Sequence, residues 1–119
     1  MKFWKKVLFK FTNAFRGIKF GVKNDKSIQI QLFFMLTAIV ISLFLKVSTL
    51  DFILITIVST IVVAVEFLNS AIEMLSDFAS ENKYYEKIKI VKDLSAAAVL
   101  ITATFALIVG ILVFSKYIL

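Results

Sequence analysis

The feature that most limits how this chain can fold is its long stretches without a charged residue. Residues 27–45 form a run of 19 uncharged residues, and residues 94–115 form a run of 22. A helix of about 20 residues spans the roughly 30 Å hydrocarbon core of a bilayer. A third stretch, residues 52–77, begins apolar and continues as a predicted helix through acidic positions. The sequence therefore predicts an all-α integral membrane protein with three transmembrane helices.

The composition agrees with this class and excludes several kinds of chemistry. Hydrophobic residues make up 61% of the 119 residues, and charged residues 18%. A single soluble domain of this size, here residues 1–119, could not bury so much apolar surface. The chain has no cysteine and no histidine. Disulfides, the common zinc sites and Ser-His or Cys-His nucleophile pairs are therefore excluded.

The amino-terminal segment, residues 3–22, is predicted to form an amphipathic helix on the membrane surface. Apolar side chains recur there every three or four residues, and basic side chains occupy the other faces. Eight of the fourteen positive residues fall within the first 26 positions, beside a predicted span. Such a cluster faces anionic lipid, and no nucleic-acid motif accompanies it. Three spans place this segment and the basic segment 81–93 on one side, which the positive-inside rule makes cytoplasmic.

One stripe of the middle predicted helix carries three carboxylates and an amide. Glu66, Asn69, Glu73 and Asp77 stand at offsets of 0, 3, 7 and 11 residues. At about 100° per residue, offsets 7 and 11 return to within roughly 20° of the starting direction. Ionisable groups at membrane depth cost roughly 2.5–3.5 kcal/mol each on insertion scales, and they face a protein interior or a wet cavity. The stripe therefore indicates a functional site.

Phosphoryl transfer to a lipid alcohol suits such a pair of carboxylates two turns apart. One can hold Mg²⁺, which takes one or two carboxylates plus substrate phosphates, and the other can accept a proton from a hydroxyl. No Walker A motif is present, so a nucleotide would need cytoplasmic lysines and asparagines. Lys92 and Asp93 stand at the mouth of the third span, where ordinary helix-start charge is the alternative reading. For Asp77, a structural polar contact or a headgroup location is the alternative.

A non-catalytic membrane protein, either an assembly subunit or a small channel, is the competing interpretation of the stripe. A pore needs polar residues along a whole span. Residues 52–65 offer only Thr56, Ser59 and Thr60. The charged stripe thus stops halfway across, which favours a one-sided site at the interface.

Four segments together resemble the prokaryotic diacylglycerol kinase family, which includes undecaprenol kinases. They are Asn13–Ile18 (NAFRGI), Glu66–Glu73 (EFLNSAIE), Asp77 and Lys92–Leu100 (KDLSAAAVL). The resemblance implies a homotrimer whose subunits each have a surface helix and three spans. It also implies phosphorylation of a membrane lipid hydroxyl with Mg²⁺ and ATP, at the cytoplasmic side of the bacterial inner membrane. The motifs look closer to the undecaprenol kinase branch, with diacylglycerol as the alternative substrate.

The resemblance also implies roles for individual residues. Glu66 would be the catalytic base, Asn69 would orient the site, and two carboxylates would hold the metal, namely Asp25 and Glu73. The residues near the nucleotide would be Asn13, Asp25, Glu73, Lys83, Tyr84, Tyr85, Lys92 and Asp93. Those near the lipid substrate would be Lys6, Glu66 and Ala96.

The segment after Asn24 departs from the family pattern. Asp25 stands where the family tends toward glutamate, so it keeps a carboxylate on a shorter stem. Ser27, Gln29 and Gln31 stand where the family tends toward asparagine, arginine and histidine. An amide, a positive charge and an imidazole are thereby absent, and the role of this segment is left open.

Overall fold

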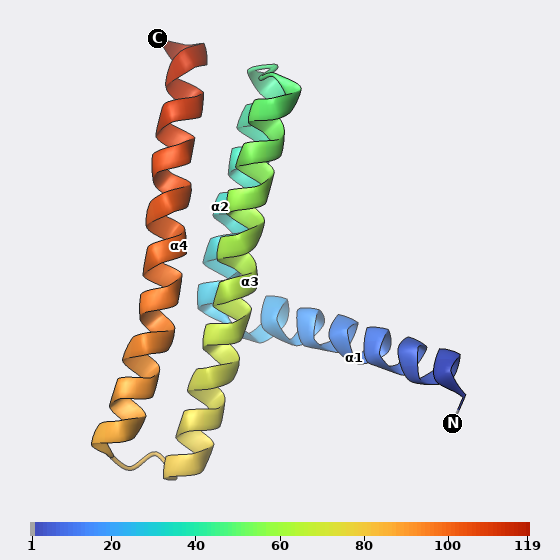
Figure 1. The fold of residues 1–119 in the computed structure, drawn as a ribbon, viewed down its shortest axis with the longest axis vertical. Coiled ribbons are helices and arrows are strands. Elements are labelled where there is room, and N and C mark those ends of the chain that lie inside the picture. The colour runs from blue at the N-terminus through green and yellow to red at the C-terminus, as the bar shows by residue number, and fades with distance from the viewer. Residues whose placement is uncertain (1) are drawn as a thin grey trace.

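The computed structural model describes residues 2–119, which form four helices and no strand (Figure 1). The helices α2, α3 and α4 run side by side, with α3 packed against both of the others, and α1 leaves the foot of α2 at a steep angle. The last three helices are long and apolar enough to cross a membrane. This confirms the predicted all-α membrane class. The helix bounds are Phe3–Asn24 (α1), Lys26–Phe44 (α2), Thr49–Ser80 (α3) and Glu86–Ile118 (α4).

Two of the helices extend beyond the spans 52–77 and 94–115 that were predicted for them. The helix α3 has 32 residues and α4 has 33. At about 1.5 Å per residue, each exceeds the roughly 30 Å hydrocarbon core. The length of an uncharged segment indicates how much of the chain can lie in lipid. Lysine and glutamate are good helix formers, so the helix can continue beyond that segment. The chain between them turns through Glu81 and Asn82, both in the left-handed region with φ of 53° and 60°.

Asp25 forms the elbow between α1 and α2. Its extended backbone, with φ −109° and ψ 112°, ends α1, and its side chain caps α2 by accepting a hydrogen bond from the Ile28 N–H at 3.0 Å. The Gln29 side chain donates to the Val22 carbonyl oxygen at 2.9 Å and so ties α2 back to α1. Two residues of the divergent segment therefore fix the angle at which α1 leaves the bundle.

Gly21 allows the end of α1 to approach α3 closely. It is the buried residue of α1, and a Cβ atom built on it would lie 2.6 Å from Phe67 Cε1 and 2.9 Å from Ile28 Cδ1. Phe67 follows Glu66 directly in α3. Because Gly21 has no side chain, the elbow can lie against α3 beside the acidic stripe.

Gly21→Ala is expected to lower the free energy of unfolding by about 1–3 kcal/mol, the usual cost of overpacking. The added methyl group displaces the Phe67 ring or pushes the elbow away from α3. Denaturant titration of the full chain in detergent measures the change. Gly17→Ala is the matched control on the same helix, because a Cβ atom there meets nothing within 4 Å. Equal effects of the two substitutions would contradict the close approach.

A polar cluster joins α3 to α4 at the end of the bundle away from α1. Asp51 is only 5% exposed. Its carboxylate accepts from Lys116 Nζ at 3.1 and 2.9 Å and from the Tyr117 hydroxyl at 2.6 Å. The same hydroxyl accepts from the Ser48 N–H at 2.9 Å. This buried carboxylate is therefore fully partnered and holds the two helix ends together.

The interior is small and more polar than the surface of the bundle. Only Ile28, Ile55, Val62 and Val113 are buried apolar residues among those described, whereas many phenylalanines and leucines are exposed. A bilayer solvates apolar side chains, so a membrane protein can turn them outward and place polar groups between its helices. The buried polar side chains include Glu66, Asn69 and Ser95.

Candidate functional site

Glu66 is the buried centre of the candidate site. It is 4% exposed and lies on α3 beside the elbow. The carboxylates of Asp25 and Glu73 and the side chains of Asn69 and Gln31 are its polar neighbours. Three acidic groups, two from the predicted stripe about two helical turns apart and one from the elbow, therefore lie in the same region of the bundle.

Asn69 links this acidic group to α4. Its Oδ1 accepts a hydrogen bond from Ser95 Oγ at 2.7 Å, and its Nδ2 reaches Glu73 Oε1 at 3.5 Å. Because a hydroxyl donates to Oδ1, the amide presents its N–H groups toward the carboxylates of α3. Ser95 has no predicted role, since its place opposite Asn69 depends on how α3 and α4 pack. Its only sequence signal is that it stands in the motif after Lys92.

Ser95→Ala is expected to lower the free energy of unfolding by about 0.6 kcal/mol, the average worth of a hydrogen bond between membrane helices. The loss also frees the Asn69 amide to turn away from Glu73. Ser42→Ala is the control, because Ser42 is also buried but its hydroxyl bonds only the Ala38 carbonyl oxygen of its own helix. Detergent unfolding titrations of both variants give the comparison. If Ser42→Ala costs as much as Ser95→Ala, the link between the helices carries no stability.

Asp25 is ionised at neutral pH. The neighbouring Ser70 hydroxyl, together with the backbone N–H groups of Ile28 and Ser27, holds the pKa of Asp25 below its ordinary value, against the opposing effect of burial. Hydrogen bonds to a carboxylate favour its charged form. Ser70 belongs to the EFLNSAIE motif and reaches Asp25 only because the elbow sits against α3. The charged carboxylate of Asp25 is therefore available as an oxygen ligand for a cation.

Below this group, toward the turn between α3 and α4, two ion pairs organise the charges. Lys92 bonds Asp77 across the two helices, and Lys89 bonds Asp93 within α4 at 2.7 Å. The alternative reading of Asp77, a structural contact, therefore agrees with its position. Lys92 and Asp93 are neighbours in sequence but have different partners. The Lys92 side chain remains 37% exposed.

The remaining predicted residues lie outside the acidic group of this single chain. Lys83, Tyr84 and Tyr85 are exposed in the turn between α3 and α4, and Ala96 is exposed on α4. The helix α1 points away from the bundle (Figure 1), and Lys6 and Asn13 are exposed residues of this helix. The structure therefore brings together Asp25, Glu66, Asn69 and Glu73, and it adds Gln31, Ser70 and Ser95.

The acidic group fits a cation that arrives with a phosphate. Within residues 2–119, no three acidic side chains are placed so that they form a metal site by themselves. Magnesium is usually bound by one or two carboxylates plus substrate phosphates and water. Asp25 and Glu73 supply two such carboxylates, and Glu73 is exposed to an incoming ligand. The donor set thus suits Mg²⁺ shared with a nucleotide.

Comparison with known proteins gives a consistent result. The family model for prokaryotic diacylglycerol kinase matches residues 12–114, which include every predicted site residue except Lys6. A protein of Synechocystis sp. described as a diacylglycerol kinase is 30% identical over 104 residues, or 87% of this chain. The match covers 59% of that relative's length. On this evidence, the chain belongs to the prokaryotic diacylglycerol kinase family.

Proposed function

We propose that this chain is a kinase that uses Mg²⁺ and ATP to phosphorylate the hydroxyl of a membrane lipid. The observation that carries the proposal is the buried Glu66 on α3, with Asn69 and Glu73 on the same face of that helix and Asp25 near it at the elbow. The family membership supports the same chemistry, because a relative is described as a diacylglycerol kinase. The basic residues of α1 and of the 81–93 segment favour the cytoplasmic face of the bacterial inner membrane.

In this proposal, Glu66 removes the proton from the lipid hydroxyl. The hydroxyl oxygen then forms a bond to the γ-phosphorus of ATP while the bond to the β-phosphate oxygen breaks, which leaves a phosphorylated lipid and ADP. Asp25 and Glu73 would hold Mg²⁺, which neutralises charge on the phosphate oxygens. Asn69 keeps Glu73 in place through its own bond to Ser95.

The nucleotide would lie below the acidic group, where cationic and aromatic side chains are exposed. Lys92 is held there by Asp77, and Lys83, Tyr84 and Tyr85 lie in the turn. The Asp93 carboxylate lies at the same end of α4 and would contact the nucleotide. Because α1 carries Lys6 and Asn13 away from its own bundle, a site shared between neighbouring subunits favours the homotrimer that we propose.

Undecaprenol is the substrate that we propose, with diacylglycerol as the alternative. Both lipids present one hydroxyl near the headgroup plane, which suits a base at the level of the elbow. The preference for undecaprenol comes from the likeness of the Asn13–Asn24 and Lys92–Leu100 runs to the undecaprenol kinase branch. The description of the Synechocystis relative favours diacylglycerol.

A radiolabel assay tests the proposed function. The purified chain in mixed micelles receives ATP labelled at the γ-phosphate, with undecaprenol and diacylglycerol in parallel reactions, each with and without Mg²⁺. We expect label in the lipid fraction only with Mg²⁺, and faster transfer to undecaprenol. Faster transfer to diacylglycerol would make diacylglycerol the preferred substrate in place of undecaprenol. No transfer to either lipid would overturn the proposed function.

A further inference from the structure

One side chain of α2 caps the end of α1 across the elbow. The last four carbonyl groups of an α-helix have no partner within that helix. In α1, the Gly21 carbonyl oxygen accepts from the Asp25 N–H at 3.0 Å. Gln29 Nε2 donates to the Val22 carbonyl oxygen at 2.9 Å and lies 3.4 Å from that of Lys23. Gln29 of α2 therefore bonds carbonyl groups for which α1 itself has no donor.

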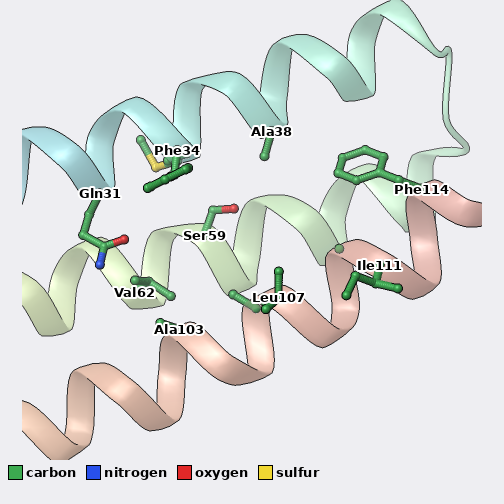
Figure 2. Close-up of a pocket in the computed structure, with 12 residues that line it drawn as sticks. Gln31, Phe34, Ala38, Ser59, Val62, Ala103, Leu107, Ile111 and Phe114 are labelled. Carbon is green, nitrogen blue, oxygen red and sulfur yellow. The ribbon is translucent and has the colours of Figure 1, made fainter.

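The two glutamines of the divergent segment have different surroundings. Residues two apart on a helix point about 200° apart. Gln31 lines the space between α2, α3 and α4, where Figure 2 shows its side chain. Gln29 is exposed and turns back to α1. The bond to α1 thus gives Gln29 a place in the structure that Gln31 does not share.

The bond from Gln29 acts on the direction of α1. The peptide groups of a helix lie roughly parallel to its axis, so the last carbonyl groups of α1 point along the axis and out of its end. A hydrogen bond weakens steeply when its angle falls below about 120°. A donor bonded to these carbonyl groups therefore resists tilting of the axis. The packing of Gly21 against Phe67 acts differently, because it sets how closely the elbow approaches α3.

Little else holds α1 at this angle. Among residues 3–24, Gly21 is the only buried one, and α1 extends away from the bundle beyond the elbow (Figure 1). Asn13 and Lys6 stand 11 and 18 residues before Asn24, or about 16 and 27 Å along the helix. A tilt of about 10° at the elbow would therefore move them by roughly 3 and 5 Å.

We propose that Gln29 is a positioning residue of the lipid kinase, which sets the angle of α1 and thereby places Asn13 and Lys6 for the reaction. The inference rests on the proposed function, in which Asn13 lies near the nucleotide and Lys6 near the lipid. Gln29 itself touches neither substrate in this role. Its bond holds α1 in one direction, so less ordering is left to be done when ATP and the lipid alcohol bind.

Distances between spin labels measure the angle of α1 without any reaction. The chain has no cysteine, so Gly17→Cys on α1 and Phe78→Cys on α3 can carry the two labels. A Cβ atom at position 17 meets nothing within 4 Å, and Phe78 is 84% exposed. The full chain in nanodiscs is diluted with unlabelled chain, so that only distances within one chain are measured. We expect one narrow distance distribution, which Gln29→Ala broadens about twofold or more, because one hydrogen bond is worth a factor of about 2–10 in an equilibrium.

Asn24→Ala is the matched control. Asn24 is also exposed at the end of α1, and its Nδ2 donates to the Phe20 carbonyl oxygen at 3.0 Å, but both residues belong to α1. We expect its distribution to equal that of the wild type. Gln29→Arg keeps an N–H donor on a long side chain and should keep the narrow distribution, whereas Gln29→Glu keeps the length and loses the donor. An unchanged distribution in Gln29→Ala, or equal broadening in Asn24→Ala, would overturn the inference.

Steady-state rates show whether the angle matters for the reaction. We expect Gln29→Ala and Gln29→Glu to raise KM for ATP and for the lipid alcohol about two- to tenfold. Their kcat should stay near the wild-type value, because Glu66 and Glu73 lie on α3. Gln29→Arg and Asn24→Ala should keep the wild-type KM values. A broadened distribution with wild-type KM values would leave Gln29 a structural residue and overturn its positioning role.

The two measurements separate failure of this inference from failure of the proposed function. If the wild-type chain transfers no phosphate but Gln29→Ala broadens the distribution and Asn24→Ala does not, Gln29 sets the angle of α1 and the kinase proposal falls. If the wild-type chain transfers phosphate and Gln29→Ala matches it in both distribution and KM, the kinase proposal stands and the role of Gln29 falls.

Discussion

Glu66→Gln is expected to reduce phosphate transfer to a lipid alcohol by about 10²–10⁴-fold, the usual contribution of a general base. The glutamine amide has nearly the same shape as the carboxylate and keeps the capacity to hydrogen-bond its polar neighbours. It cannot accept the proton of the attacking hydroxyl. The expected loss is therefore in kcat, with KM for ATP nearly unchanged. Initial rates of label transfer from ATP measure both constants.

Glu86→Gln is the matched control for this prediction. Glu86 is an exposed carboxylate in the first turn of α4 and takes no part in the acidic group. Both variants should keep the wild-type helical content and the same elution volume in detergent. If Glu66→Gln turns over at the wild-type rate, Glu66 is not the base. If Glu86→Gln is equally inactive, the loss reflects a general effect of removing a carboxylate.

Glu73→Gln is expected to raise the Mg²⁺ concentration for half-maximal activity by roughly 10–100-fold, the order of change seen when the support of a metal site is removed. Glu73 is exposed beside the buried Glu66, and Asn69 Nδ2 lies 3.5 Å from its Oε1. An amide oxygen carries no charge and binds Mg²⁺ more weakly. Activity should recover at high Mg²⁺, because the base itself is intact.

Recovery of Glu73→Gln activity at high Mg²⁺ distinguishes a metal ligand from a structural residue. A titration of Mg²⁺ at fixed ATP gives the half-maximal concentration for wild type, Glu73→Gln and the control Glu86→Gln. Asp25→Asn should shift the titration in the same direction as Glu73→Gln. An unchanged midpoint with a lower plateau would remove Glu73 from the metal site.

The membrane-spanning helices could be predicted from the sequence, and the ends of α2 to within one residue, but the ends of α3 and α4 could not. Uncharged runs such as residues 94–115 report the length of chain that lipid tolerates. The run does not predict that α4 begins at Glu86, because charged residues can extend a helix beyond the lipid into water. The partnered cluster around Asp51 was also unpredictable, since Lys116 and Tyr117 come from the far end of the chain.

The stripe on α3 could be predicted as a face, because the spacing of Glu66, Asn69 and Glu73 repeats with the helix. What that face meets depends on tertiary packing. The elbow brings Gln31 to Glu66 and brings Asp25 to Ser70, and the angle of that elbow depends in part on the absence of a side chain at Gly21.

The pairing of charges near the turn between α3 and α4 also could not be predicted from the sequence. Lys92 and Asp93 are adjacent in sequence, yet a helix turns successive residues about 100° apart. Each charge therefore finds a partner elsewhere, Lys92 on α3 and Asp93 one turn back at Lys89. Their adjacency in sequence therefore does not place the two side chains on one face of α4.

Magnetic resonance of the chain with Mn²⁺ and ATP tests most directly whether the acidic group handles a metal-bound phosphate. Mn²⁺ takes the same oxygen ligands as Mg²⁺, and its unpaired electrons report nearby phosphorus nuclei. We predict one bound Mn²⁺ per chain that is coupled to ATP phosphorus, with affinity lowered at least tenfold when Asp25→Asn and Glu73→Gln are combined. Undiminished Mn²⁺-ATP binding in that double variant would contradict the assignment of these carboxylates.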